Sequence, residues 1–332
     1  MNGIEQYWYR SSPLHLILLP IAWLFGALSA LRRLLYRIHV LKSFRLPVPV
    51  VIIGNITVGG TGKTPLTLAV AEHLKKSGYC PMIISRGYRG NRMQQAVTES
   101  SKATEVGDEP LLMAKRNICP VWVGRDRVSV ARQALHLHPQ CNVLLFDDGL
   151  QHYRLRRDYE IAVIDGVRRF GNGHLLPAGP LREPSSRLQT VDAVVVNGGE
   201  PSPDAKNQYA MHLSGNVFRN LRHPERTASA EQFAGLSLHA AAGIGNPARF
   251  FAHLASMGLS FIPHAFPDHH LFKESDLRFE PCDALLLTEK DAVKCKEFAD
   301  ERYWVLRVDA EVDSALLSHL LRKIAIHGRK TA

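Results

Sequence analysis

A glycine-rich turn between an apolar segment and a helix-compatible segment is the part of this sequence most suited to chemistry. Residues 50–64 read VVIIGNITVGGTGKT, and the glycines of the turn let backbone N–H groups converge on phosphate oxygens. The lysine directs positive charge toward the β- and γ-phosphates, and the final threonine hydroxyl suits a magnesium ion. We therefore predict a nucleoside triphosphate-binding loop made by Thr57, Val58, Gly59, Gly60, Thr61, Gly62, Lys63 and Thr64.

The loop departs from the pattern G-x-x-x-x-G-K-[ST], because Thr57 stands where the pattern has its first glycine. A glycine turn before an ordinary helix is the competing interpretation, and GKT alone would favour it. The flanking segments favour phosphate binding instead. The β-branched residues 50–53 predict a strand and residues 65–76 predict a helix, as the mechanism requires.

A second apolar segment ends in two carboxylates. Residues 143–146 predict a buried strand that stops at Asp147 and Asp148, at the strand end where open α/β sheets bind ligands. A carboxylate there can hold Mg²⁺ directly or through water, completing the ligand shell that Thr64 begins. A plain Asp-Gly turn is the alternative, and the sequence leaves open which aspartate contacts the metal.

Three further polar segments have structural as well as chemical interpretations. Asp108 follows a glycine before a predicted helix, where an aspartate commonly caps the helix. Arg182 lies in the glycine- and proline-rich loop 171–184, and an arginine beside a phosphoryl group can neutralise its oxygens. Residues 288–291 (TEKD) resemble a guanine-reading box, but the lysine stands one place late, so ATP is the expected nucleotide.

Strands and helices alternate along most of the chain. Further strands are predicted at 82–84, 120–123, 159–164, 191–197, 239–244, 283–287 and 304–308, and further helices at 111–116, 128–137, 247–257 and 314–326. This alternation predicts a P-loop NTPase-like α/β/α core with a mostly parallel sheet. We expect three regions: a membrane-associated helical segment (1–45), the P-loop core (46–215), and a smaller C-terminal α/β domain (216–332) that closes over the cleft.

The N-terminal segment has the composition of a membrane-associated helix. Residues 14–31 are 18 residues without a formal charge, and a helix of that length would reach roughly 27 Å, close to the thickness of a hydrocarbon core. From 31 to 41, apolar residues at helical spacing lie beside Arg32, Arg33 and Arg37, which predicts a helix on the membrane surface. These basic residues favour a cytoplasmic location for the following domains. A signal peptide and a buried soluble helix are the alternatives.

Composition restricts the class of protein. The chain has 332 residues, 45% of them hydrophobic, which is enough for about two packed domains. Five scattered cysteines without a C-x-x-C pair indicate a reducing compartment. The formal charge is +10, and residues 1–45 contribute half of that excess through six basic residues against one acidic residue. Because the basic residues surround an apolar segment, we expect a membrane surface and no nucleic acid as partner.

Seven motifs occur together and in order: GGTGKT, SRGYRG, GDEP, DDGLQH, PAGPLREP, PDHH and TEKDAVK. In this combination the chain resembles the tetraacyldisaccharide 4'-kinase family, the lipid A 4'-kinases of Gram-negative bacteria, over essentially its whole length. That family similarly lacks the first loop glycine. The resemblance implies transfer of the ATP γ-phosphate to the 4'-hydroxyl of a tetraacylated disaccharide 1-phosphate, forming lipid IVA at the inner membrane.

The resemblance also implies roles for individual residues. Asp108 of GDEP is expected to work with His269 of PDHH on the proton of the sugar hydroxyl, and Arg182 is expected near the active centre with Lys63. The partner is then an acylated disaccharide 1-phosphate lipid at the inner membrane, with the catalytic domains facing the cytoplasm. Since exposing each acyl CH₂ costs about 0.8 kcal/mol, the enzyme has to come to the membrane surface.

A hypothesis from another class is a membrane-bound P-loop switch or metallochaperone ATPase, which uses hydrolysis for timing. In that case His264, His269 and His270 are candidate metal ligands.

Overall fold

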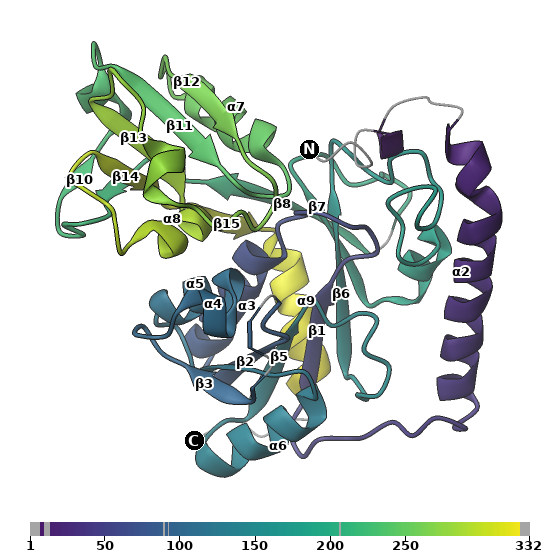
Figure 1. The fold of residues 1–332 in the computed structure, drawn as a ribbon. Coiled ribbons are helices and arrows are strands. Elements are labelled where there is room, and N and C mark those ends of the chain that lie inside the picture. Colours follow the sequence, from purple (N-terminus) through teal and green to yellow (C-terminus); the bar gives the residue numbers. More distant parts are fainter. Residues whose placement is uncertain (1–6, 10–13, 89, 92, 206, 326–332) are drawn as a thin grey trace.

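Two mostly parallel sheets form the framework of the molecule, which we describe from a computed structural model (Figure 1). The structure describes residues 7–9, 14–88, 90–91, 93–205 and 207–325, so parts of the predicted segment 1–45 lie outside the described residues. The larger sheet has nine strands in the order β15-β8-β7-β6-β1-β5-β2-β4-β3. The smaller sheet has six strands in the order β10-β9-β14-β13-β11-β12. The predicted α/β class is therefore confirmed.

The larger lobe contains most of the predicted elements. Its strands are β1 (Val50–Gly54), β2 (Pro81–Ser85), β3 (Gln95–Val97), β4 (Val121–Val123), β5 (Val143–Asp147), β6 (Tyr159–Asp165), β7 (Ala193–Asn197), β8 (Gln208–Ser214) and β15 (Asp309–Val312). Its helices are α3 (Lys63–Lys76), α4 (Ala103–Val106), α5 (Asp108–Lys115), α6 (Arg127–Leu137), α9 (Ser314–Ala325) and the 3₁₀ helix η1 (Ser185–Thr190). The sequence analysis missed β3, β8 and β15, because much of their surface is exposed and no apolar run marks them.

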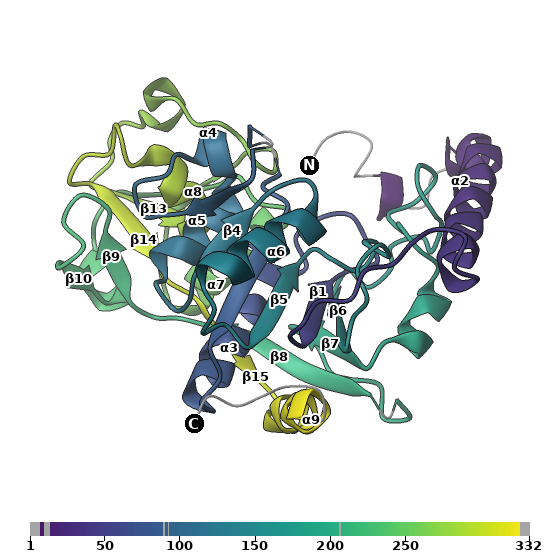
Figure 2. The same cartoon turned by 90° about the horizontal axis from the view of Figure 1, so that it is seen from below.

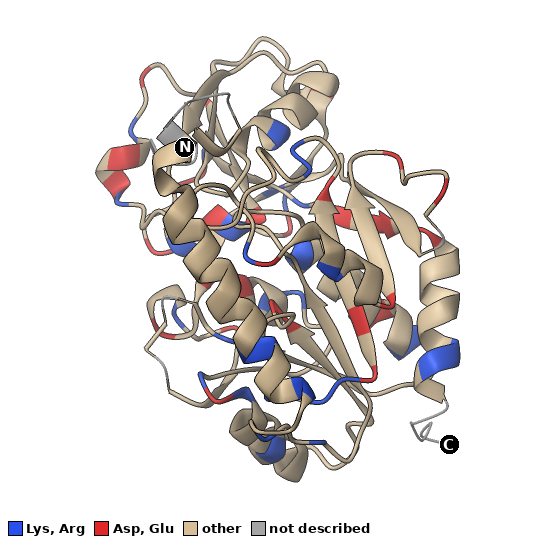
Figure 3. Cartoon of the chain, turned by 90° about the vertical axis from the view of Figure 1, so that its right-hand side faces the viewer, with Lys and Arg blue, Asp and Glu red and all other residues tan. Residues whose placement is uncertain are grey.

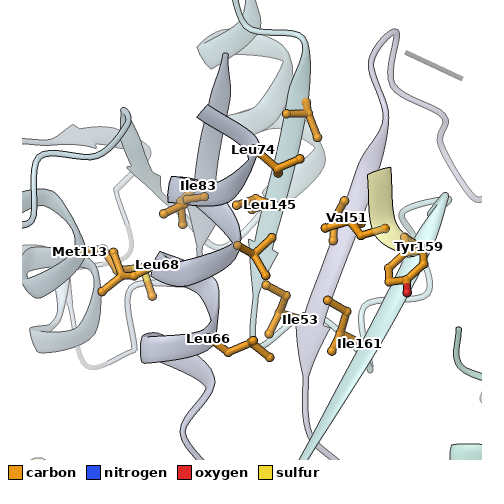
Figure 4. Packing of buried hydrophobic residues seen from close by; sticks show 14 of the residues in the cluster. Val51, Ile53, Leu66, Leu68, Leu74, Ile83, Met113, Leu145, Tyr159 and Ile161 are labelled. Carbon is orange, nitrogen blue, oxygen red and sulfur yellow. The ribbon is translucent and has the colours of Figure 1, made fainter. Parts of the chain in front are cut away.

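Apolar residues of β1 pack on both faces of the nine-stranded sheet. Val51 and Ile53 belong to the cluster that includes Leu66 of α3, as Figure 4 shows. Val50 and Ile52 belong to the cluster on the opposite face, which α6 covers. Successive side chains of a strand point to opposite faces, so a strand buried on both sides has to be apolar throughout. This requirement explains the unbroken run VVII before the glycine-rich turn.

The smaller lobe has its own sheet and two hydrophobic clusters. Its strands are β9 (Phe218–Asn220), β10 (Thr227–Ala228), β11 (Leu238–Ala242), β12 (Ile262–Ala265), β13 (Ala284–Thr288) and β14 (Tyr303–Leu306). Its helices are α7 (Pro247–Ser256), α8 (Glu289–Cys295) and the 3₁₀ helices η2 (Ala230–Phe233) and η3 (Glu274–Leu277). Asn246 precedes α7, but its side chain does not cap the helix; its Nδ2 lies 3.4 Å from Asp165 Oδ2 in the larger lobe.

The last described part of the chain returns to the nine-stranded sheet. Strand β15 pairs antiparallel with β8, and α9 buries Leu316, Leu320 and Ile324 in the same cluster as α3. Residues 309–325 therefore depart from the predicted range 216–332 for the smaller domain. Two segments of the chain consequently join the lobes, one between β8 and β9 and the other between β14 and β15.

Helix α2 (Leu14–Arg37) lies along one side of the larger lobe, apart from the helices that cover its sheet (Figures 1 and 2). It is one continuous helix of 24 residues, whereas the predicted surface helix over 31–41 is wrong beyond Arg37, where the chain turns. Among the described residues, His15–Arg37 is a helix long and apolar enough to cross a membrane. Basic residues gather toward the C-terminal end of α2 in Figure 3.

We predict that Leu320→Ala lowers the free energy of unfolding by about 2–5 kcal/mol, because a fully buried leucine leaves a cavity when truncated. Chemical denaturation of the whole chain measures the change. Leu317→Ala on the same helix makes the same chemical change at a half-buried position, and we expect a smaller loss from it. Equal losses at both positions would contradict the described packing of α9.

Candidate functional site

The predicted phosphate loop joins β1 to α3 at the carboxyl end of the larger sheet. Gly59 (φ 104°) and Gly62 (φ 93°) adopt the left-handed conformation that favours glycine. Gly62 precedes α3 with no side-chain cap, so the first N–H groups of the helix are left for another acceptor. Lys63 and Thr64 are the first two residues of α3. This is the geometry in which a helix N-terminus binds phosphate oxygens.

The backbone is extended at Thr57, the residue that stands where the loop pattern has its first glycine. Any residue can adopt this conformation, so a glycine is not needed there. Thr57 forms an antiparallel bridge with Leu181, and Val58 N donates to Pro180 O at 2.9 Å. Because its N–H group is engaged with the protein, Val58 is a poorer candidate for the phosphate cradle than the sequence suggested. The same pairing brings the next residue, Arg182, to the phosphate loop.

Asp147 and Asp148 lie next to the phosphate loop, because β5 pairs directly with β1. Asp148 Oδ1 is 3.5 Å from Lys63 Nζ and 3.1 Å from Arg182 Nη1. Burial opposes ionisation, but Lys63, Arg182 and Arg127 hold the pKa of Asp148 well below its usual range. The predicted residues Lys63, Arg182 and Asp148 thus form one ion-paired group.

Asp147 is in a different electrostatic state from its neighbour. It is 1% exposed, and burial raises the pKa of its carboxyl group. Within the described part of the chain, no hydrogen-bond donor reaches its Oδ2. A cation would satisfy this oxygen and favour the ionised carboxylate.

Asp108 and His269 come together from different lobes. Asp108 begins α5, whereas His269 lies between β12 and η3 with a left-handed φ of 59°. His269 Nδ1 lies 2.8 Å from Asp108 Oδ2. Burial acts to raise the pKa of Asp108, but the hydrogen bond from His269 and the charge of Lys290 lower it to about 2. Asp108 is therefore an ionised carboxylate at neutral pH.

A cavity of roughly 400 Å³ joins these groups to α2. The carboxylates of Asp108, Asp147 and Asp148 line one side of it, and side chains of α2 line another. The α2 residues are Phe25, Ser29 and Arg32. The neighbouring Arg33 on α2 lies 3.6 Å from Glu183, the residue after Arg182. The N-terminal helix is therefore part of the wall of the site.

The histidines considered as metal ligands do not come together. His264 stacks on Phe279, His269 contacts Asp108, and His270 Nε2 lies 3.0 Å from Asp276 Oδ2. Within the described ranges, no group of three or more His, Cys, Asp or Glu side chains is arranged to hold a metal ion. The metallochaperone hypothesis therefore gains no support from these side chains.

Several residues that the sequence analysis did not single out complete the surroundings of the loop. Asn197 Nδ2 donates to Thr61 O at 2.9 Å, and Arg127 donates to the backbone oxygens of both aspartates. Gly245 of the smaller lobe lies so close to Gly60 that a Cβ would collide with its backbone. The position of Asn197 at the carboxyl end of an apolar strand was a usable signal. No local pattern marks the contact of Gly245.

A glycine-rich loop after β1, carboxylates at the end of the adjacent β5 and a second lobe over the loop are the arrangement of a P-loop nucleotide-binding enzyme. The family model described as tetraacyldisaccharide-1-P 4'-kinase matches residues 14–325. The chain belongs to this family, as the motifs predicted.

Relatives and a solved structure agree with this assignment. A tetraacyldisaccharide 4'-kinase of Methylobacillus flagellatus is 50% identical over 322 residues, covering 97% of this chain and 95% of the relative. One from Azoarcus is 48% identical over 336 residues, covering 100% and 98%. The crystal structure of LpxK from Aquifex aeolicus, described as an "apo" form in complex with ATP, has a TM-score of 0.79 and 28% identity, covering 94% of this chain and 99% of that chain.

We predict that Lys63→Met lowers turnover at least about 10³-fold, since Lys63 begins α3 directly after the predicted phosphate loop, where its charge would meet the phosphates. The thermal unfolding curve should stay close to that of the unchanged chain. Lys76→Met is the matched control, because Lys76 lies on the same helix, pairs with Glu72 and is exposed. Undiminished turnover by Lys63→Met would contradict the assignment of the loop.

Proposed function

We propose that this chain transfers the γ-phosphate of ATP to the 4'-hydroxyl of a tetraacylated disaccharide 1-phosphate at the cytoplasmic face of the inner membrane. The observation that carries this proposal is one cavity lined by Asp108, by Asp147 and Asp148, and by the apolar helix α2. Such a cavity can hold the polar sugar of a lipid while the acyl chains stay with the membrane. Family membership supports the same reaction.

Asp108 is the candidate proton acceptor for the attacking hydroxyl. A sugar hydroxyl is a poor nucleophile, and a positioned carboxylate accepts its proton as phosphoryl transfer proceeds. Asp108 lines the cavity, whereas His269 does not, so we assign the contact with substrate to Asp108. His269 donates from Nδ1 and fixes the orientation of the carboxylate. Lys63 and Arg182 neutralise negative charge on the transferring group.

Mg²⁺ fits the oxygen donors that Asp147 and Thr64 offer beside the phosphate loop. Oxygen ligands suit this ion, and Asp147 offers a buried oxygen that no donor from the described residues satisfies. The Thr64 hydroxyl on the first turn of α3 is the second candidate ligand. Asp148 is already paired with Lys63 and Arg182, so we assign it to orienting these cations beside the metal site. A bound Mg²⁺ would offset the charge of the β- and γ-phosphates.

Helix α2 is proposed to lie in the membrane surface without crossing the bilayer. Its contacts with the protein recur on one face from His15, which stacks on His174, to Tyr36, whose ring is tilted against that of Tyr153 at 6.1 Å between centroids. That face includes Ala22 and Gly26, which pack closely. These contacts extend for about 31 Å at 1.5 Å per residue, and a spanning helix would have to give up most of them.

The opposite face of α2 is apolar and exposed. Its residues are Ile17, Ile21, Leu24, Leu28 and Leu31. An exposed apolar stripe of this length is typical of a helix that lies in the headgroup region with its apolar side toward the acyl chains. Arg32, Arg33 and Arg37 near its C-terminal end would attract anionic lipid headgroups.

The proton-transfer roles are tested by Asp108→Ala, His269→Ala and the double variant. We expect each single change to lower kcat by about 10²–10⁴-fold, the usual scale for general acid–base catalysis, with ATP affinity nearly unchanged. Because the two residues act as one unit, the double variant should be little slower than either single variant. Transfer of label from γ-labelled ATP to a chloroform-soluble lipid measures the rate. Losses that multiply, or an effect on the KM for ATP alone, would refute the pairing.

The membrane role is tested by replacing Leu24 and Leu28 together with serine. Removing two exposed apolar side chains from the outer face should weaken binding to vesicles that contain anionic lipids, while ATP affinity stays the same. Co-sedimentation with vesicles measures the binding. Leu137→Ser changes an equally exposed leucine on α6 and serves as the control. Equal vesicle binding by both variants would contradict the proposed contact face.

A further inference from the structure

Residues 288–291, which end β13 and begin α8, contact the Asp108–His269 pair, and the proposed reaction gives them no role. Asp291 is 0% exposed, and its Oδ2 accepts from Gly243 N at 2.9 Å. Gly243 O in turn accepts from His269 N at 3.1 Å. The backbone of His269 is therefore held through Gly243 by a buried carboxylate of α8.

Lys290 reaches from α8 into the pair itself. Its Nζ lies 2.9 Å from Glu109 Oε1, 3.1 Å from Asp268 Oδ1 and 4.0 Å from Asp108 Oδ2. The side chain is 15% exposed. Although burial opposes its charge, Glu109, Asp108 and Asp268 raise the pKa of Lys290 above its ordinary value. It is therefore an ammonium ion, and it joins α8 of one lobe to α5 of the other.

The ammonium group restricts where His269 can carry its proton. Lys290 Nζ lies 3.4 Å from His269 Nε2, and an ammonium group can donate but cannot accept. A favourable contact at that distance requires Nε2 to be the nitrogen without a proton. Asp268 Oδ2 is 3.7 Å from Nε2, which is too long for a hydrogen bond. Nδ1 faces both oxygens of Asp108 and has to donate.

We propose that Lys290 is a positioning residue whose ammonium group donates to His269 Nε2 and holds the imidazole in the tautomer that donates from Nδ1 to Asp108. The inference rests on the proposed function, because it deepens the roles of that pair. With Nε2 occupied, His269 has no free site to take the proton of the substrate. Asp108 is then the proton acceptor, and His269 orients it.

A purely structural link between the lobes is the competing explanation. Arg116 provides the comparison, since it also joins α5 to the smaller lobe, with Nη2 2.6 Å from Glu289 Oε2. It is similarly buried, with 7% of its side chain exposed, but it contacts neither Asp108 nor His269 in the described structure. If Lys290 only joined the lobes, replacing either cation would have similar effects.

The test is ¹⁵N NMR of the whole chain with labelled histidine, in which His269→Gln assigns the signal. We expect the shifts of His269 to report the Nδ1-protonated tautomer at neutral pH. In Lys290→Met we expect the Nε2-protonated tautomer or a mixture of the two, and a kcat lowered by about 10²-fold, the low end of the scale for general acid–base catalysis, with an unchanged Kd for ATP. Arg116→Met should leave the tautomer unchanged. Lys290→Gln, which keeps a donor without the charge, should keep more of the original tautomer and provides a second variant.

Two results would overturn the inference. One is an Nε2-protonated or doubly protonated His269 in the unchanged chain, which decides the question even when no Lys290 variant folds. The other is a Lys290→Met variant that loses kcat while its tautomer stays the same, which means a structural role. Failure of the proposed function is recognised separately: full kcat in Asp108→Ala and His269→Ala would remove the roles of that pair whatever the spectrum reports.

Discussion

The junction between α5 and α8 is the contact on which the arrangement of the site depends. Asp108 and His269 are 161 positions apart in sequence and belong to different lobes, yet they share a hydrogen bond of 2.8 Å. Each lobe has its own hydrophobic clusters, so neither needs the other to bury its core. The polar contacts at the junction therefore serve geometry more than stability. They place the imidazole of His269 from one lobe within hydrogen-bond distance of the Asp108 carboxylate of the other.

The charged groups of the site form two sets, the cations Lys63 and Arg182 with Asp148, and the buried carboxyl group of Asp147. A bound nucleotide with its metal ion would contact both sets. Lys63 and Arg182 already have a carboxylate partner in Asp148, which keeps these cations ordered beside the phosphate loop. Asp147 is buried, and its Oδ2 lacks a hydrogen-bond donor or a cation among the described residues. In the proposed site, a triphosphate with its metal ion would supply anionic oxygens for Lys63 and Arg182 and a cation for Asp147. Side chains of α2 line the cavity beside them, so the helix that we propose to face lipid shares a wall with the proposed phosphoryl site.

The sequence predicted what local patterns encode. The apolar runs of β1, β5 and β6 identified the buried parallel strands, whereas the nucleotide side of the site, predicted from GKT and the paired aspartates, stays a prediction. The pairing of Asp108 with His269 came from the family resemblance, since no spacing connects residues in different lobes. Strands β8 and β15, at one end of the nine-stranded sheet, were missed because half-exposed strands lack an apolar run. Long-range contacts such as Gly245 on Gly60, and Lys290 on the Asp108–His269 pair, depend on how the lobes pack and leave no local signal.

The most direct test of the central claim is the position of the transferred phosphate. The purified chain is incubated with ATP, Mg²⁺ and a tetraacylated disaccharide 1-phosphate in mixed micelles. The lipid product is then examined by ³¹P–¹H correlation NMR. We predict a new phosphomonoester whose phosphorus couples to the proton at the 4' carbon, formed in equal amount with ADP. ADP formed with inorganic phosphate alone, or a phosphorus coupled to another sugar position, would contradict a site that directs the 4'-hydroxyl at the γ-phosphate.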